Sequence, residues 1–95
     1  MTKQARKKLL TKVLARDGSK CHYCLRDDLV RGLGIGIIEP NTMTLDRITP
    51  GIAGGRYVYD NVVIACFKCN NSRGTNQYDY FFQKTRRNLI REKVS

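Results

Sequence analysis

The stretch "CFKCNNSRG" at residues 66–74 decides the fold of this 95-residue chain, because its two cysteines complete a set that begins with "CHYC" at residues 21–24. Four thiolates in two Cys-x-x-Cys pairs supply all the ligands that a tetrahedral zinc ion needs. Such a site has no open position for water or substrate, so we expect the zinc to be structural. The predicted zinc ligands are Cys21, Cys24, Cys66 and Cys69.

The alternative use of the four cysteines is a pair of disulfide bonds. That use would need an oxidising compartment, and residues 1–18 are charged throughout, without the apolar core of a secretory signal. The chain also has no run of about 18 apolar residues that could span a membrane. We therefore favour zinc over disulfides, and we predict a cytoplasmic protein with no membrane partner.

The net charge of +10 is concentrated at the two ends of the chain. Residues 1–20 hold seven basic and one acidic side chain, which gives +6, and residues 84–95 hold five basic and one acidic, which gives +4. Residues 21–83 hold six of each and are neutral. Two basic ends on a neutral centre favour a polyanionic partner such as DNA. Basic surfaces that serve only solubility are the alternative.

Three segments have the patterns of regular structure at the start and in the middle of the chain. Apolar residues at helical spacing (Ala5, Leu9, Leu10, Val13, Leu14) predict a helix over residues 3–16, which Gly18 ends. Residues 43–48 predict a short strand in which Leu45 and Asp46 point to opposite faces. The sequence "VVIAC" at residues 62–66 predicts a second buried strand or turn.

The remaining segments are less regular. Residues 25–42 alternate glycine with apolar side chains, which fits a hairpin, a bulged strand or a mobile loop. The sequence "NNSRG" predicts the start of a short helix that breaks at Gly74. Residues 77–92 predict a last helix with Tyr78, Phe81, Phe82 and Leu89 on its inner face.

Four motifs taken together resemble the HNH endonuclease family, also called the ββα-metal nucleases, over about residues 9–75. They are "LARDGSKCHYC", "LDRITP", "GIAGGRYVYDNVV" and the opening stretch "CFKCNNSRG". The resemblance implies an α+β fold, with a zinc-stapled ββα-metal core at residues 21–75. A basic helix at residues 1–20 and a second basic helix at residues 76–95 would flank this core within a single domain.

The resemblance also implies site residues. Asp46 matches the acid that binds the catalytic divalent ion, Mg²⁺ or Mn²⁺, and Asn70 matches the second protein ligand. Asn61 matches an asparagine that braces the central loop through backbone hydrogen bonds. One carboxylate, one amide and phosphate oxygens are sufficient for Mg²⁺, which prefers oxygen ligands and keeps several waters. The plainer alternatives are an ion pair with Arg47 or a capping role for Asp46, and a helix N-cap for Asn70.

Arg47 stands where most members of the family carry the histidine that activates water. An arginine cannot accept a proton near neutral pH, but it can bind a phosphate oxygen and stabilise transition-state charge. A partner for a carboxylate or a DNA phosphate, without catalytic effect, is the alternative. The Asp-Arg form resembles that of phage-type members, which suggests a phage or mobile element as the source and the host-cell cytoplasm as the location.

The general base must then come from another residue. Tyr57, on the loop expected to face the metal, is the first candidate, ahead of Tyr59 and His22. A tyrosine ordinarily has a pKa of about 10, so it would need a nearby cation to serve. For Tyr57 the alternative is a role in aromatic packing on the hairpin that the two expected strands form. For His22 the alternative is that it is a partly exposed residue within the first Cys-x-x-Cys pair, with no catalytic role.

These features predict a divalent-metal-dependent endonuclease that nicks or cuts DNA by hydrolysing phosphodiester bonds. A zinc-stapled nucleic-acid-binding module with little or no catalysis is the alternative, and a zinc domain that binds a host protein is a third. Residues 1–95 show no separate specificity domain, so we expect either weak selectivity or dependence on a homodimer, a partner protein or a branched DNA shape. The expected phosphate contacts are Lys3, Lys7, Lys8, Lys12, Arg56, Lys68, Arg73, Lys84, Arg87 and Arg91.

Overall fold

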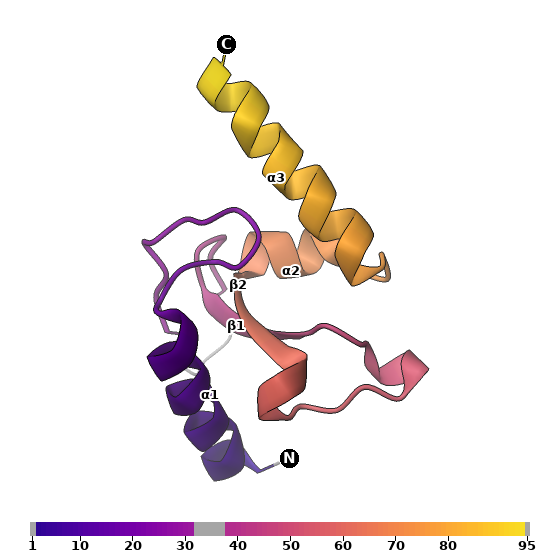
Figure 1. Cartoon of the computed structure of the whole chain (residues 1–95). Coiled ribbons are helices and arrows are strands. Elements are labelled where there is room, and N and C mark those ends of the chain that lie inside the picture. Colours follow the sequence, from indigo (N-terminus) through magenta and orange to yellow (C-terminus); the bar gives the residue numbers. More distant parts are fainter. Residues whose placement is uncertain (1, 32–37, 95) are drawn as a thin grey trace.

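The chain folds as α+β, as predicted, with helices on both sides of a two-stranded antiparallel sheet (Figure 1). The computed structural model describes residues 2–31 and 38–94, with side chains as far as Arg91. The glycines of the segment predicted as a hairpin, a bulged strand or a mobile loop (residues 25–42) fall within residues 32–37, which lie outside the described residues. The elements are α1 (Lys3–Asp17), β1 (Met43–Arg47), η1 (Gly51–Ala53), η2 (Tyr59–Asn61), β2 (Val62–Cys66), α2 (Phe67–Arg73) and α3 (Tyr78–Val94).

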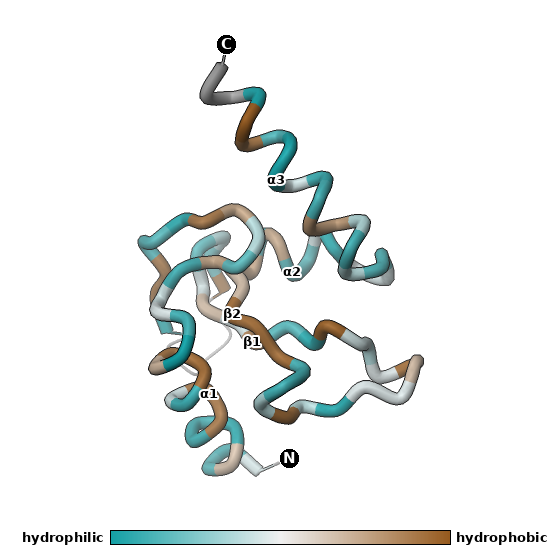
Figure 2. Tube along the Cα trace, viewed as in Figure 1, coloured by the Kyte–Doolittle hydropathy of each residue, from teal (hydrophilic) through white to brown (hydrophobic). Residues whose placement is uncertain are grey.

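Strand β2 is the centre of the molecule, and all five of its residues are buried. It pairs with β1 in a register that sets Leu45 opposite Ile64 and Asp46 opposite Val63. Side chains alternate between the two faces of a strand. Leu45 and Ile64 accordingly join a cluster with α1, whereas Val63 joins a cluster with the first Cys-x-x-Cys pair and α3. Figure 2 shows β2 as a continuous hydrophobic segment, as expected of a strand covered on both faces.

Helix α1 covers one face of this sheet. It begins where the Thr2 hydroxyl accepts a hydrogen bond from the backbone N–H of Ala5 (3.1 Å), and it ends before Gly18, whose φ of 78° suits glycine. Val13 is fully buried against β1 and β2, but Ala5, predicted on the inner face, is exposed. The half-buried residues that pack around Val13 from the same helix are Leu9, Leu10 and Leu14.

Helices α2 and α3 lie on the opposite side, and α3 extends away from the sheet (Figure 1). Helix α2 begins at Phe67, inside the second Cys-x-x-Cys pair, because Cys66 acts as its N-cap. Phe81 of α3 is buried, and the two aromatics predicted beside it, Tyr78 and Phe82, pack against the same cluster. No helix within residues 2–31 and 38–94 is both long and apolar enough to cross a membrane.

Candidate metal centre and catalytic cleft

The four cysteines converge on one point, although residues 25–65 separate the two pairs. Their sulfur atoms all lie within 4.8 Å of one another, and the Sγ atoms of Cys24 and Cys66 are 3.9 Å apart. Sulfurs around a zinc ion with bonds of about 2.3 Å are about 3.8 Å apart, so the arrangement fits the ion. No cysteine is in a disulfide bond, which argues against that alternative.

Proton sharing among these sulfurs supports the same interpretation. A hydrogen bond from the Cys69 thiol lowers the pKa of Cys21 to about 4, while that bond and burial raise the pKa of Cys69. Four thiolates this close repel one another unless protons or a cation separate them. A bound zinc ion replaces those protons and satisfies all four sulfurs at once.

Backbone hydrogen bonds bring the first pair to the second. The N–H of His22 donates to the carbonyl of Ile64 in β2 (2.8 Å), and the N–H of Leu25 donates to the carbonyl of Cys21 (3.0 Å). Leu25, the residue after Cys24, adopts a positive φ of 64° and closes the turn that contains both ligands. The second pair needs no separate loop, because Cys66 ends β2 and Cys69 lies in the first turn of α2.

A small cleft of about 150 Å³ opens where the end of β1 meets α2. It brings together four of the predicted site residues: Asp46, Arg47, Tyr57 and Asn70. Its other lining residues are Leu45, Pro50, Arg73 and Gly74. The cleft is therefore the place where a phosphate group and a divalent ion could meet the predicted residues.

Asp46 is buried to 8% exposure, and only one of its two oxygens has partners within the described residues. Its Oδ2 accepts hydrogen bonds from the Tyr23 hydroxyl and from Nη1 of Arg73, the latter at 2.6 Å. The Oδ1 atom accepts none from the described residues. A carboxylate held by one oxygen and unpaired at the other can offer the second to a metal ion.

Arg73 corrects two expectations from the sequence. It is 3% exposed and forms the ion pair with Asp46 that the alternative reading gave to Arg47. Its guanidinium also donates from Nη1 to the carbonyl of Arg47 (2.6 Å) and from Nη2 to that of Ile48 (2.8 Å), so both terminal nitrogens bind groups of the protein itself. Arg73 is therefore not available as a surface phosphate contact, and that expectation is wrong.

The electrostatics of this buried pair follow from its contacts. Desolvation lowers the pKa of the Arg73 guanidinium, but the hydrogen bond and charge of Asp46 outweigh that effect and raise it. Burial, followed by the hydrogen bond to Asp46, raises the pKa of Tyr23, so the phenol stays protonated and acts as a donor. Both partners therefore donate to the same Oδ2 atom of Asp46.

Asn70 is oriented by a short chain of hydrogen bonds. The Thr44 hydroxyl donates to the carbonyl of Ala65 (2.8 Å), so its lone pair is left to accept from Nδ2 of Asn70 (3.0 Å). This hydrogen bond identifies the nitrogen end of the Asn70 side-chain amide. The side-chain oxygen, Oδ1, has no partner among the described residues. Asn70 lies within α2, whose N-cap is Cys66, so the N-cap alternative for Asn70 is wrong.

Arg47 and Tyr57 form a stack at the mouth of the cleft. The guanidinium carbon of Arg47 lies 4.4 Å from the centre of the Tyr57 ring. Within the described residues Arg47 makes no ion pair, and its Nη1 lies 2.7 Å from the position that a Cβ on Gly51 would take. The ring and the glycine fix the guanidinium without neutralising it, so its charge remains available to an anion.

Asn61 lies outside the cleft and holds the loop above it. Its side-chain oxygen accepts from the N–H of Thr49 (2.8 Å), and its Nδ2 donates to the carbonyls of Thr49 (3.0 Å) and Arg56 (2.9 Å). Gly55 lies in the same loop, where a Cβ would come within 1.6 Å of the Thr49 carbonyl oxygen. This is the geometry that a bracing role for Asn61 requires.

The other two candidate bases lie away from the cleft. Tyr59 is exposed and stacks with Arg16 at 4.7 Å, and His22 is half-buried beside Tyr78. Burial, followed by the charge of Arg86, lowers the pKa of His22. Neither residue lines the cleft, so Tyr57 is the only one of the three in reach of a phosphate bound there.

The predicted phosphate contacts other than Arg73 are exposed, but they lie on different parts of the molecule. Lys3 and Lys7 line a pocket between α1 and β1, together with Arg6 and Arg31, which the sequence gave no reason to select. The remaining exposed residues are Lys8, Lys12, Arg56, Lys68, Lys84, Arg87 and Arg91. Tyr23 was also missed, because nothing in the pattern of a Cys-x-x-Cys pair indicates a long-range hydrogen bond.

Comparison with known families gives one result. A family model described as HNH endonuclease matches residues 21–76, which is more than half of the chain. The matched segment runs from the first zinc-ligand cysteine to just beyond α2, so it contains both cysteine pairs and the whole cleft. A search of curated proteins finds no match to the chain.

Proposed function

Because the chain belongs to the HNH endonuclease family, we propose that it is a divalent-metal-dependent endonuclease that hydrolyses phosphodiester bonds in DNA. One observation carries the proposal. Asp46 and Asn70 line the same cleft, and each offers it one oxygen that has no partner in the described chain. The other Asp46 oxygen is held by Tyr23 and Arg73, and the Asn70 amide nitrogen is held by Thr44. Two converging hard oxygens suit Mg²⁺ or Mn²⁺.

The chain's own groups then have separate tasks. Asp46 and Asn70 would hold the ion, which supplies Lewis-acid polarisation of the scissile phosphate and charge for the leaving oxygen. Arg47, stacked on Tyr57 and without an ion pair in the described chain, would bind a non-bridging phosphate oxygen and stabilise the added negative charge. Asn61 would keep in place the loop that follows this arginine and contains Thr49 and Arg56.

Removal of a proton from the attacking water is assigned to Tyr57 by position alone. It lines the cleft beside Arg47, whereas Tyr59 and His22 do not. Its ring is half-buried and packs against the α1 side of the sheet, so the stacking role is also present. A variant Tyr57→Phe keeps the stack and removes the hydroxyl, and it separates the two roles.

The second candidate function is a zinc-stapled module that binds nucleic acid without cutting it. The observation that favours it is the arginine at the position of the family's water-activating histidine. The orientation of Asn70 by Thr44 argues for catalysis, because a module that only binds phosphate has no need of a fixed amide oxygen in a cleft.

Supercoiled plasmid is the substrate for the test. Purified protein is incubated with Mg²⁺, Mn²⁺ or EDTA, beside Asp46→Ala and the matched control Asp27→Ala, which removes an exposed acid outside the cleft. We expect metal-dependent nicking or cutting by the wild type and the control, and loss of at least about 100-fold with Asp46→Ala. Tight, salt-sensitive DNA binding with no cleavage in either metal would leave the binding module as the function.

A further inference from the structure

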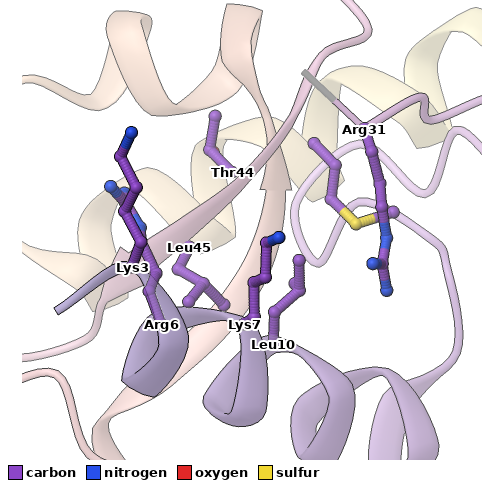
Figure 3. A pocket seen from close by; sticks show the side chains of 8 residues that line it. Lys3, Arg6, Lys7, Leu10, Arg31, Thr44 and Leu45 are labelled. Atoms are coloured by element: carbon purple, nitrogen blue, oxygen red, sulfur yellow. The ribbon is translucent and has the colours of Figure 1, made fainter. Parts of the chain in front are cut away.

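An unassigned pocket lies between α1 and β1 (Figure 3), hereafter the basic pocket. It has a volume of about 440 Å³, within the range of about 300 to 1,000 Å³ that ligand sites occupy. Figure 3 shows Lys3 and Arg6 of α1 on one side and Arg31 on the other, with Leu45, Lys7 and Leu10 between them. The lining residues are Lys3, Arg6, Lys7, Leu10, Arg31, Met43, Thr44 and Leu45.

The charge of the basic pocket is one-sided. Four of its lining residues are cationic and none is acidic, and the neighbouring residues 32–37 contain no charged side chain in the sequence. The ion pairs within the described residues involve other arginines, so the four cations are not neutralised by any of them. Unneutralised cations around a hollow attract an anion, and repulsion among them is relieved when one binds.

The floor of the basic pocket is apolar. Leu10 and Met43 are half-buried and Leu45 is buried, and all three belong to the cluster on the α1 side of the sheet. A bare inorganic anion would leave this floor without a partner. A ligand that combines a phosphate with an apolar sugar or base surface would use both the rim and the floor.

The basic pocket adjoins the catalytic cleft. Leu45 lines both, and the centre of the Tyr57 ring is close to the guanidinium carbons of both Arg47 (4.4 Å) and Arg6 (5.9 Å). A track of alternating cations and apolar surface therefore runs from the cleft into the pocket. A chain of phosphates that enters the cleft could continue along this track.

We propose that the basic pocket binds an unpaired nucleotide of the DNA strand that is cut, with its phosphate at the cationic rim and its sugar and base on the apolar floor. This inference rests on the proposed nuclease function and specifies its substrate as DNA with an unpaired nucleotide next to the scissile bond. In a continuous duplex the base would stay stacked in the helix, so the nucleotide could not enter the pocket and would not bring its phosphate to the cationic rim.

Helix α1 provides a matched control for this proposal. At about 100° per residue, Lys3 and Lys7 lie on the face of α1 that lines the pocket, whereas Lys8 and Lys12 lie on other faces and are exposed. The double variants Lys3→Ala/Lys7→Ala and Lys8→Ala/Lys12→Ala remove the same charge from the same helix. A difference between them reports the pocket rather than the net charge.

The test measures binding of fluorescent single-stranded DNA and duplex DNA by anisotropy, without added Mg²⁺ or Mn²⁺, so that no cleavage occurs and the zinc stays bound. The Lys3→Ala/Lys7→Ala variant should bind single strands about 20-fold more weakly at 0.1 M salt and lower the salt slope by about 1.4, as expected for two lost phosphate contacts at about 0.7 each. The Lys8→Ala/Lys12→Ala variant should lose less than about 3-fold, because screened charges make no direct contact. Single-strand binding should suffer more than duplex binding in the first variant.

Equal losses in the two double variants would overturn the proposal, and so would equal losses for single strands and duplex. Polyglutamate that competes with the oligonucleotide at equal charge and depends on Lys3 and Lys7 would assign the pocket to an acidic polypeptide instead. The proposed function can fail separately. If the wild type shows the expected binding but cuts no plasmid in either metal, the pocket still binds a nucleotide and the endonuclease function is wrong.

Discussion

At the scale of single residues, each candidate metal ligand in the cleft is oriented by hydrogen bonds with neighbouring side chains. Tyr23 and Arg73 hold one oxygen of Asp46, and Thr44 holds the nitrogen of Asn70. Partners that orient metal ligands typically change metal affinity by about 10- to 100-fold when they are removed. Substituting these partners should therefore change metal affinity measurably, as substituting the ligands would.

Thr44→Val is the sharpest change of this kind, because valine keeps the shape of threonine and removes the hydroxyl. Without that acceptor the amide of Asn70 can turn, and we expect about 10-fold weaker binding of Mn²⁺ with an unchanged fold. Titration followed by electron paramagnetic resonance measures the affinity. Thr85→Val, on α3 and away from the cleft, is the control, since its hydroxyl bonds only the carbonyl of Phe81. Equal Mn²⁺ affinity in the wild type and Thr44→Val would show that Thr44 does not orient the ligand.

Arg47 is the residue whose role differs most between an enzyme and a binding module. Arg47→Ala should lower kcat by about 100-fold, as loss of one donor to a developing oxyanion does, while DNA affinity falls less. Arg47→His should retain cleavage or raise it, because an imidazole can supply the base that arginine cannot. Single-turnover cleavage beside DNA-binding measurements separates the two effects. If Arg47→His abolished cleavage and left binding intact, the guanidinium itself would be required in the transition state.

At the scale of elements, the two faces of β2 contact two different parts of the molecule. The face with Val62 and Ile64 packs on α1, which carries the basic pocket, and the face with Val63 and Ala65 packs on the zinc centre and α3. Arg86 ties α3 to the first Cys-x-x-Cys pair by donating to the carbonyls of His22 (2.8 Å) and Tyr23 (3.0 Å). Position of the zinc centre and position of α3 are therefore coupled.

Arg86→Ala should destabilise the fold by about 1.5 to 3 kcal/mol, the usual contribution of hydrogen bonds that involve a charged group. Arg87→Ala is the matched control, because Arg87 is exposed on the same helix and makes no hydrogen bond within the described residues. Urea unfolding of both variants gives the two free energies. Equal stability of Arg86→Ala and Arg87→Ala would mean that α3 does not depend on the first pair.

The elements were largely predictable from the sequence, and the contacts inside the cleft were not. Helix α1 has apolar residues at helical spacing, as a helix buried on one side requires, and β2 is a continuous apolar run, as a strand covered on both faces requires. Both cysteine pairs, and the grouping of Asp46 with Asn70 in one cleft, followed from zinc chemistry and the family motifs. The partners of Asp46, namely Tyr23 and Arg73, are 23 and 27 residues away, and no local pattern marks them.

At the scale of the whole molecule, the cysteine cluster that fits a zinc ion is built into the core. The cluster that contains Cys21, Cys66 and Cys69 also contains Tyr23 and Phe81, so the metal ligands are part of the core on one face of the sheet. A small domain buries a modest fraction of its surface and commonly needs such a staple. The same cluster positions Tyr23 against Asp46, which links zinc to the cleft.

Removal of zinc should therefore unfold the chain. The binding free energy of structural zinc, about 10 to 16 kcal/mol, is comparable with the whole stability of a typical domain, about 5 to 15 kcal/mol. Circular dichroism during chelation, with zinc content followed by atomic absorption, should show helix loss in step with metal loss. Cleavage activity should fall in parallel. An unchanged spectrum after complete zinc removal would contradict a structural role.

The central claim is that Asp46 and Asn70 bind one divalent ion beside Arg47. The most direct measurement is an anomalous scattering map from crystals of the protein soaked in Mn²⁺, with data collected on both sides of the manganese edge. The account predicts one manganese peak in the cleft, bonded to the Oδ1 atoms of Asp46 and Asn70, in addition to zinc at the four cysteines. A map with zinc at the cysteines and no manganese in contact with Asp46 would contradict it.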